Sequence, residues 1–298
     1  MHIVIRAHLG DEVALTAFVR EVKKQYPEEP IVIDGKYPEV WKYNTRLEGK
    51  GKHTLPTVQM RPWATDYQDK GPLPICYAHQ AGGMVVSDPT PEVFVGGEDQ
   101  EKAQILLGGA KGSPGLVAID PWAAWTSRRW EFERWVVVCK MLQSDGWGVV
   151  EVGRETPDEQ GNIQTGLLPA NVQLHNKTSV LEVAAVLRVC KLFVGSDSGL
   201  FHLAAAVGTP QVVLFGPKPW YSRAYWNTVP VYSSVNCSSS CGMTCVLPRH
   251  CLRDIHAGDV QRAVDVASER FYGFTRFRPV TMPGKPLSEM IIEERRGG

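Results

Sequence analysis

Several features are missing from the 298-residue sequence, and their absence argues against whole classes of protein. No apolar run approaches the roughly 20 residues that cross a bilayer, so we expect no transmembrane segment. The first ten residues resemble the start of a strand, with Asp11 and Glu12 directly after them, and do not resemble a signal peptide. We therefore expect a cytoplasmic protein that is at most peripheral to a membrane.

An excess of charge of one sign is also missing, because 32 Lys and Arg balance 32 Asp and Glu. The zero net charge argues against nucleic acid or an anionic bilayer as the partner of the whole surface, while a local basic patch stays open. Repeats and low-complexity segments are absent as well. The sequence does contain enough apolar material for cores, at 43% hydrophobic residues, and its length predicts two domains of roughly 100–200 residues each.

The first part of the chain alternates between strand and helix patterns. Residues 3–5 and 31–33 are short apolar runs, and residues 11–26 between them carry apolar side chains at close to helical spacing. Strand, helix and strand in this order predict a parallel βαβ unit.

The pattern is poorer from residue 36 to residue 115, where Pro and Gly recur. We interpret the short apolar pieces at 57–60 and 74–77 as strands. Residues 108–115 have the Gly-rich composition of a linker, so we expect a first domain at 1–112.

A second alternating block predicts a second domain at 113–272. Strands are expected at 116–119, 147–152, 171–174, 192–194, 212–215 and 229–232, and helices at 131–143, 179–189, 200–207 and from about 258. The expected fold is α/β, with two doubly wound, Rossmann-like domains that face a central cleft at the carboxyl ends of their strands. Residues 273–298 form a C-terminal tail that we expect to pack back on the first domain.

The most informative segment covers residues 192–217. A buried strand ends at Gly195, and the polar turn Ser196–Gly199 then opens a helix. The N–H groups at that helix start form an anion site suited to a diphosphate, although Asp and Ser are also ordinary helix caps. His202, one turn further, either reaches the same ligand or is a satisfied histidine. No Gly-x-Gly-x-x-Gly opens the first helix, which argues against a dehydrogenase.

This segment resembles the hallmark of the heptosyltransferase family, glycosyltransferase family 9, which is close to Asp-Thr/Ser-Gly-x-x-His-x-x-Ala-Ala-x-x-x-Pro, a strand and Gly-Pro. The matching residues are Asp197, Ser198, Gly199, His202, Ala205, Ala206, Pro210, Gly216 and Pro217. Residues 5–11 are similar to the family's first strand and Gly-Asp turn, and residues 177–179, with Leu181 and Glu182, to the turn that leads into the helix before the hallmark. Arg128 lies at the Lys of the family's Lys-x-Trp-Pro segment, although Glu131 replaces the Pro.

The resemblance implies a GT-B fold and an inverting glycosyltransferase that needs no metal or other cofactor for catalysis. The second domain would bind the nucleotide-diphosphate sugar and the first domain the acceptor. Asp11 would take the proton from the acceptor hydroxyl as general base, although the residues alone explain it equally well as a helix cap. The family's donor is ADP-heptose and its acceptor a sugar of the lipopolysaccharide core. A small molecule, a protein, a modified nucleobase or nucleic acid stays open as acceptor.

The resemblance also implies a donor site in the second domain. Arg128 and the amide groups from Ser198 to Leu200 would neutralise the diphosphate. Asp197 would accept hydrogen bonds from the hydroxyl groups of the donor sugar. The other expected donor contacts are Thr178 near the nucleobase, Glu155 or Asp158 at the ribose, and Gly199 and His202 beside the diphosphate.

The seven cysteines are unevenly spread. Three lie singly in or near apolar segments and are expected to be buried, namely Cys76, Cys139 and Cys190. Four lie within fifteen residues and resemble a cluster that many family members carry, namely Cys237, Cys241, Cys245 and Cys251. Four thiolates can hold a structural zinc ion, and free thiols, two disulfides or a labile cluster site are the alternatives.

Two further functions stay open. A non-catalytic module that binds a nucleotide sugar is one, although the presence of Asp11 and Arg128 counts against it. A nucleotide-sugar epimerase on the same fold is the other. Residues 122–130 mix Trp and Arg as a stacking surface for a nucleobase would, or as a Trp-rich domain interface would.

Overall fold

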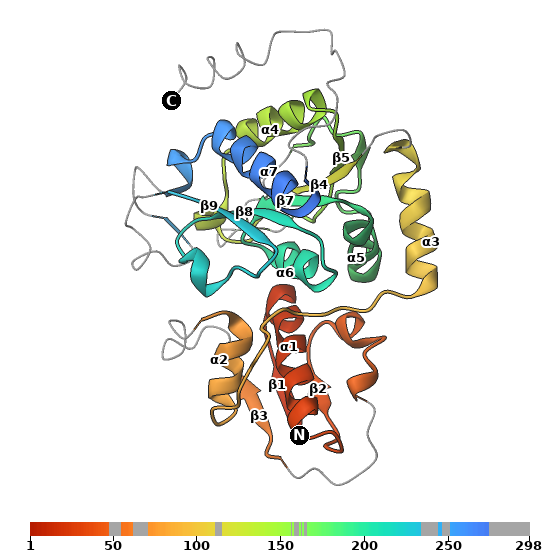
Figure 1. The fold of residues 1–298 in the computed structure, drawn as a ribbon, viewed down its shortest axis with the longest axis vertical. Helices are drawn as coiled ribbons and strands as arrows, with labels where there is room; N and C mark the ends of the chain where they lie inside the picture. The colour runs from red at the N-terminus through yellow and green to blue at the C-terminus, as the bar shows by residue number, and fades with distance from the viewer. Residues whose placement is uncertain are drawn as a thin grey trace.

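The computed structural model describes residues 1–47, 55–61, 71–110, 115–155, 157, 161, 163, 166–233, 244–245 and 251–273. They form two α/β units, one above the other in Figure 1, each built on a parallel sheet. This confirms the predicted α/β class. Within those ranges, no helix combines the length and the apolar character that crossing a bilayer requires.

The first unit contains the predicted βαβ arrangement. Its strands are β1 (His2–Ile5), β2 (Val32–Asp34) and β3 (Val58–Met60), its helices α1 (Leu9–Gln25) and α2 (Leu73–Gln80), and its short turns η1 (Pro38–Trp41) and η2 (Thr45–Leu47). The sheet order is β2-β1-β3, with both pairs parallel. Glu12 of α1 is fully buried and accepts the backbone N–H groups of Lys36 and Tyr37 and the indole N–H of Trp41, which ties α1 to the loop after β2.

The predicted strand at 74–77 is wrong, because these residues belong to α2. A short apolar run fits a buried strand or a buried helix equally well. Here the helix forms because Pro72 and Pro74 fall at its start, where the missing N–H groups have no intrahelical partner to lose. The helix packs on α1, and the hydroxyl of its buried Tyr77 donates to the carbonyl oxygen of Asp11.

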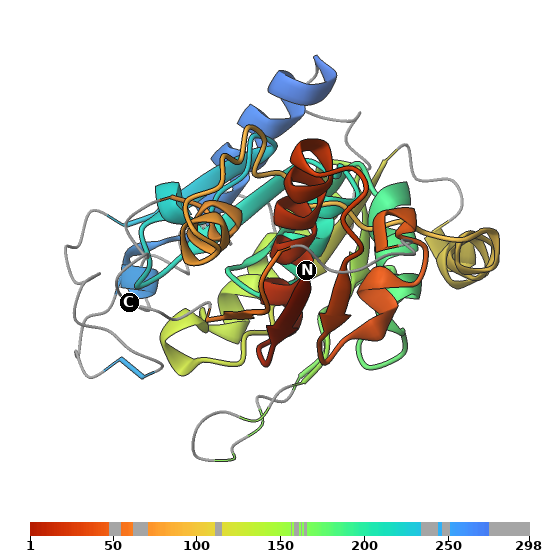
Figure 2. The ribbon, with the colours of Figure 1, turned by 90° about the horizontal axis from the view of Figure 1, so that it is seen from below.

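The helix α3 (Gly97–Leu106), followed by the turn η4 (Leu107–Ala110), was not predicted. Asp99 and Ala103 are its buried residues, so the apolar periodicity that marks a helix is weak. It packs on α5 (Val180–Val189) of the second unit, at one side of the molecule in Figures 1 and 2. The domain boundary after residue 112 stays a prediction, and α3 precedes that boundary although it lies against the second unit.

The second unit contains a sheet of six parallel strands in the order β6-β5-β4-β7-β8-β9. The strands are β4 (Leu116–Asp120), β5 (Gly148–Glu151), β6 (Val172–Gln173), β7 (Leu192–Ser196), β8 (Gln211–Phe215) and β9 (Thr228–Tyr232). The helices besides α5 are α4 (Phe132–Ser144), α6 (Gly199–Ala206) and α7 (Ala257–Tyr272), and the short turns are η5 (Thr126–Arg128), η6 (Trp220–Ser222) and η7 (Cys251–Asp254). The predicted elements of this domain are confirmed, with ends that differ by one or two residues.

The strand order places a topological switch between β4 and β7. The chain runs outward from β4 to β6 and then from β7 to β9 on the other side. Alternate residues of these strands face opposite layers: Val117 and Ile119 pack with α4 and α7, and Ala118 and Val213 pack with α5 and α6. In such sheets ligands bind outside the carboxyl ends of the strands at the switch.

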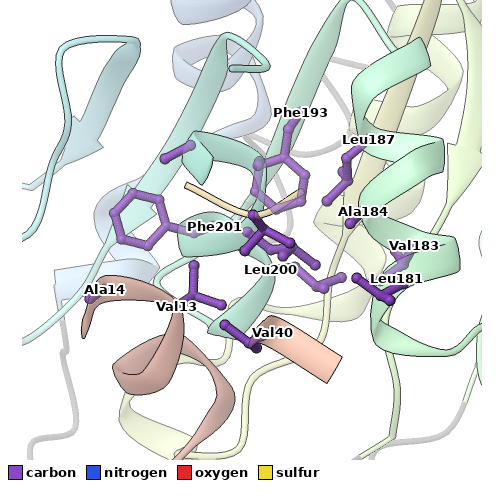
Figure 3. Packing of buried hydrophobic residues seen from close by; sticks show 14 of the residues in the cluster. Val13, Ala14, Val40, Leu181, Val183, Ala184, Leu187, Phe193, Leu200 and Phe201 are labelled. Atoms are coloured by element: carbon purple, nitrogen blue, oxygen red, sulfur yellow. The ribbon is translucent and has the colours of Figure 1, made fainter. Parts of the chain in front are cut away.

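The two units meet where α1 packs on α6. One cluster of buried apolar side chains runs from α1 through α6 to α5. Figure 3 shows two of its residues in α1, Val13 and Ala14, next to α6, which carries Leu200 and Phe201. The units therefore share a core instead of being joined by a linker alone. In Figure 2, which looks from below, α1 and the first sheet lie in front of the second unit.

Two glycines allow the starts of α1 and α6 to approach each other. A Cβ added to Gly199 would lie 3.4 Å from the Cβ of Leu9 and 3.5 Å from the backbone nitrogen of Gly10. A Cβ added to Gly10 would overlap the ring of His202. The absence of both side chains brings two helix N-termini, each with a partial positive charge, to the same place.

Candidate active site

A cleft of about 950 Å³ opens between the start of α1 and the carboxyl edge of the second sheet. Its lining carries charges of both signs, with Asp11, Glu39, Asp120 and Asp197 against Arg128, Arg154, Lys218 and Arg223. Of the residues predicted from the sequence, Asp11, Arg128, Thr178, Asp197, Ser198, Gly199 and His202 all line it. The structure thus gathers residues from 11 to 202 around one cavity.

Asp11 is both a helix cap and a cleft residue. It occupies the third position of α1, and its Oδ2 accepts the backbone N–H of His8 at 3.0 Å. Burial raises the pKa of Asp11 above its ordinary value, while Arg223, His8 and Arg128 partly oppose the shift. A carboxylate with a raised pKa at the wall of a cleft has the properties that general-base chemistry needs.

Arg128 lies across the cleft at the end of η5. Its guanidinium stacks over the ring of Trp125 at 4.1 Å, and its Nη1 donates to the carbonyl oxygen of Asp197 at 3.0 Å. Its Nε is buried and has no hydrogen-bond partner among the described residues. Burial lowers the pKa of Arg128 somewhat, but an arginine keeps its charge at neutral pH. The side chain is therefore a fixed cation with donor capacity left for a ligand.

The carboxylate of Asp197 is buried beside these cations. Arg128 Nη1 lies 3.4 Å from Asp197 Oδ2. Burial alone would raise the pKa of Asp197, but the charges of Arg128 and Arg223 outweigh it and keep the pKa below its ordinary value. Asp197 is thus an anion at neutral pH, and it can accept hydrogen bonds from hydroxyl groups.

The start of α6 has an unusual cap. Ser198 is its N-cap residue, but the Ser198 side chain makes no hydrogen bond to the amides of the helix. Instead its hydroxyl donates to Asp120 Oδ2 at 2.7 Å. The first amides of α6 are therefore left without a side-chain cap at the wall of the cleft, which favours an anion there.

His202 lines the cleft but is held from behind. Its Nδ1 lies 2.7 Å from the hydroxyl of the buried Tyr225. Burial lowers the pKa of His202 to about 3, so the ring is neutral over the working range of pH. The two predicted roles of His202, ligand contact and satisfied histidine, are compatible, because Nδ1 is bound by Tyr225 while Nε2 lies on the side of Gly10, where α1 meets α6.

The predicted ribose contact is displaced from the cleft. Glu155 does not line the cavity, and its carboxylate lies 3.7 Å from His175 Nε2. Its neighbour Arg154 lines the cavity instead, and Thr178 lines it at the start of α5. The alternative ribose residue, Asp158, lies outside the described residues.

The cysteine cluster cannot be assembled from the described residues. Cys251 is buried in η7 and Cys245 is half-buried, while Cys237 and Cys241 lie outside the described ranges. Within those ranges no three His, Cys, Asp or Glu side chains gather as a metal site. The three single cysteines are buried as predicted, and burial raises the pKa of Cys139 and of Cys190 to about 12.

Five charged cleft residues were missed in the sequence: Glu39, Asp120, Arg154, Lys218 and Arg223. Asp120 offered the clearest signal, since it is an acidic residue directly after a buried strand. Once that strand is placed at the switch of a parallel sheet, its carboxyl end is expected to face the ligand crevice. The two cations Lys218 and Arg223 follow β8 in a loop and carry no comparable pattern.

The profile of glycosyltransferase family 9 (heptosyltransferase) matches residues 79–250. Lipopolysaccharide heptosyltransferase 1 of Pseudomonas aeruginosa is 28% identical over 195 residues, which are 64% of this chain and 52% of that protein. Lipopolysaccharide heptosyltransferase 2 of Salmonella typhimurium is 32% identical over 97 residues, 31% of this chain and 28% of that protein. The chain therefore aligns with between about a quarter and a half of the length of these relatives.

Solved structures agree over a larger part of the chain. A family 9 glycosyltransferase from Veillonella parvula superposes with a TM-score of 0.67 at 16% identity, covering 89% of this chain and 96% of that one. The E. coli ADP-heptose heptosyltransferase II superposes with a TM-score of 0.64 at 14% identity, covering 91% and 99%. A dodecameric iron-containing heptosyltransferase from E. coli, in complex with ADP-D-beta-D-heptose, superposes with a TM-score of 0.62 at 17% identity, covering 90% and 76%. The predicted GT-B fold is thereby confirmed.

Proposed function

Because the chain belongs to glycosyltransferase family 9, the heptosyltransferase family, we propose that it transfers a sugar from a nucleotide-diphosphate donor to an acceptor hydroxyl. The observation that carries the proposal is the meeting of the starts of α1 and α6 at one cleft, with Asp11 on one and Asp197 to Gly199 on the other. The second unit would bind the diphosphate of the donor at its anion site, and the first unit would provide the base for the acceptor hydroxyl. The transfer needs both groups on opposite sides of the reacting carbon.

The donor's diphosphate would bind at the start of α6. The amides of that helix, Arg128 and Arg223 all border the same part of the cleft. Charge-assisted hydrogen bonds from these groups stabilise the charge that develops on the diphosphate as the bond to the sugar breaks. Because the protein's own cations lie at this place, we propose that transfer needs no metal ion.

The acceptor would be activated from the opposite wall. Asp11 would take the proton of the attacking hydroxyl as that oxygen forms its bond to the anomeric carbon and the diphosphate leaves from the other side. A single displacement of this kind inverts the configuration at the anomeric carbon. Asp197, held anionic by Arg128, would accept hydrogen bonds from the sugar's hydroxyl groups and orient the ring.

The substrates are proposed from the relatives. Two similar proteins are named lipopolysaccharide heptosyltransferases, and one superposable structure holds ADP-D-beta-D-heptose. We therefore propose ADP-heptose as donor, a lipopolysaccharide core sugar as acceptor, and a cytoplasmic location at the membrane surface.

The test is an assay of sugar transfer with defined products. The purified chain is incubated with ADP-heptose, and in parallel with other nucleotide sugars, in the presence of a heptose-free core acceptor. Mass spectrometry should show an acceptor gain of one heptose, and NMR should show an α linkage formed from a β-configured donor. A product with retained β configuration would refute Asp11 as the base of a single displacement. Donor binding without hydrolysis or transfer to any acceptor would favour a non-catalytic module.

The proposed structural metal is tested in the same preparations. Zinc at the cysteine cluster would stabilise the fold locally, since metal binding to thiolates is linked to folding. One superposable structure is iron-containing, so elemental analysis should cover iron as well as zinc. We expect EDTA to lower the melting temperature of a metal-loaded protein and to leave transfer intact. Loss of activity in EDTA that Mg²⁺ or Mn²⁺ restores would refute a metal-independent transfer.

A further inference from the structure

The buried carboxyl group of Asp120 takes part in none of the steps above. It stands at the carboxyl end of β4, at the switch point, and is 2% exposed. Its Oδ1 accepts the backbone N–H of Trp122 at 3.1 Å, and its Oδ2 accepts the Ser198 hydroxyl at 2.7 Å. A Cβ added to Gly153 would overlap Oδ1, so this glycine leaves room for the carboxyl at the floor of the cleft.

The bond to Ser198 has a consequence for α6. A serine at an N-cap normally accepts a hydrogen bond from the second or third amide of its helix. The same residue type does so elsewhere in this chain, where Ser179 caps α5 through the N–H of Glu182. At α6 the Ser198 side chain points to Asp120 and does not cap. The two serines differ in the carboxyl group beside them: Glu182 belongs to the first turn of α5 and accepts the backbone N–H of Ser179, whereas Asp120 lies on β4 and accepts the Ser198 hydroxyl.

We propose that Asp120 is a positioning residue of the donor site: it holds the Ser198 hydroxyl off the start of α6 and so keeps the first amides of that helix open for the anionic group of a nucleoside diphosphate. This inference rests on the proposed function, because it takes the start of α6 as the diphosphate site. Without the Asp120 carboxyl, the Ser198 hydroxyl is free to cap α6 and to compete with the ligand for the same amides.

The negative charge of a bound diphosphate is expected to favour the protonated form of the Asp120 carboxyl. Burial raises the pKa of Asp120 to about 7, against the hydrogen bonds from Ser198 and Trp122, and the charge of Glu151 on the neighbouring strand β5 raises it further. The groups that face this carboxyl are therefore one hydroxyl, one amide and another carboxyl. A diphosphate at the start of α6 adds negative charge nearby, so its binding favours the protonated form of Asp120. Ligand binding and proton uptake are then coupled.

The experiment measures binding of ADP, UDP and GDP to the full chain by calorimetry at several pH values. For the wild type, we expect affinity to fall roughly 3- to 10-fold between pH 6 and pH 8, the range for up to one linked proton. Asp120→Asn keeps a group that holds Ser198 Oγ and cannot ionise, so the fall caused by Asp120 should be absent and only the dependence from the ligand's own phosphate, which ionises at about pH 6, should remain. Asp120→Ala should bind these nucleotides roughly 3- to 10-fold more weakly, because the freed Ser198 hydroxyl then caps α6 and a serine N-cap is typically worth about this much.

A double variant separates positioning from mere loss of structure. Asp120→Ala combined with Ser198→Ala removes the competing hydroxyl, so it should bind more tightly than Asp120→Ala alone. Asp120→Ala should also melt no lower than the wild type, because the freed serine caps α6. Glu151→Gln is the matched control: this carboxyl is buried on the adjacent strand and lies outside the cleft, so affinity should hold while the pH transition moves slightly lower.

Each outcome has a distinct meaning. Wild-type binding together with unchanged affinity in Asp120→Ala overturns this inference alone. A double variant no better than Asp120→Ala overturns it too, because the loss then comes from the cavity and not from a competing cap. A wild type that binds none of the three diphosphates overturns the proposed donor site, and this inference with it.

Discussion

Replacing Asp11 by Asn separates the two roles that its position allows. Asp11 Oδ2 accepts the N–H of His8 at 3.0 Å, and the amide oxygen of Asn accepts the same bond. At this third helix position Asn keeps the hydrogen bond and loses only the interaction of a negative charge with the helix start, so the free energy of unfolding should fall by at most about 1 kcal/mol. The amide of Asn cannot take a proton from an acceptor hydroxyl, so the base function is removed.

The expected loss of turnover is large. A positioned general base contributes roughly 10²- to 10⁴-fold, which corresponds to about 2.7–5.4 kcal/mol in the activation barrier. Donor affinity should be nearly unchanged, because the proposed diphosphate site lies at the start of α6 and at Arg128. The pH profile supplies a second readout. Since burial raises the pKa of Asp11 and the ionised form is the base, the wild-type rate should rise with pH through that raised pKa. In Asp11→Asn this limb should be absent.

The assay compares initial rates of transfer, donor affinity and thermal unfolding for wild type and variant. Glu12→Gln is the control, because Glu12 is the adjacent carboxyl, is fully buried, and holds three N–H donors of the loop after β2. Its loss should cost stability of about 1–3 kcal/mol and leave the turnover of the folded enzyme within about threefold. Turnover above a tenth of wild type in Asp11→Asn would leave Asp11 as a helix cap and refute the assignment.

Three more predictions concern the opposite wall and the joint. Arg128→Ala should weaken nucleoside diphosphate binding by about 1.5–3 kcal/mol. Arg129→Ala should change the affinity little, because the Nε of Arg129 donates to a loop carbonyl oxygen. A larger loss in Arg129→Ala would show that the alignment of Arg128 with the family motif is wrong. Gly10→Ala should destabilise the fold by about 1–3 kcal/mol in denaturant titrations, because the new methyl group overlaps His202; a neutral effect would contradict the tight joint. Folding raises the pKa of Asp120 from 3.8 to about 7, so the free energy of unfolding of the wild type should fall as the pH rises toward 8 and this carboxyl ionises. The free energy of unfolding of Asp120→Asn should therefore exceed that of the wild type increasingly between pH 5 and pH 8, by at most ~4 kcal/mol. The same pH dependence in both proteins would contradict the raised pKa.

The hallmark segment could be predicted because its information is local. A buried strand, a polar turn and a helix follow each other within residues 192–206, so the turn that faces the cleft is readable without any tertiary contact. Arg128 was found only through the resemblance to the family, because it lies at the Lys of the Lys-x-Trp-Pro segment. Asp11 was placed at the cleft because the predicted βαβ unit puts its turn at a carboxyl end.

What could not be predicted depends on contacts between distant parts of the chain. The role of Asp120 arises from its bond to Ser198, 78 residues later, and this bond exists because β4 pairs with β7 in the register of Asp120 with Gly195. In the sequence Ser198 resembles an ordinary N-cap, whereas in the structure its hydroxyl donates to Asp120 and does not cap α6. The partner of His202 is likewise a tyrosine in a loop 23 residues later.

The contact between α1 and α6 also explains how the proposed base and the proposed anion site keep a constant separation. In the sequence, Gly10 precedes Asp11 and Gly199 opens α6, and in the structure each glycine touches the other helix. Both helices continue into one apolar core that includes Val13, Leu200 and Phe201. The positions of Asp11 and of the α6 amides are therefore set by helix packing and not by loops. A substitution at this contact is expected to change catalysis by moving one wall of the cleft relative to the other, because a misplacement of about 1 Å can reduce a rate by two orders of magnitude.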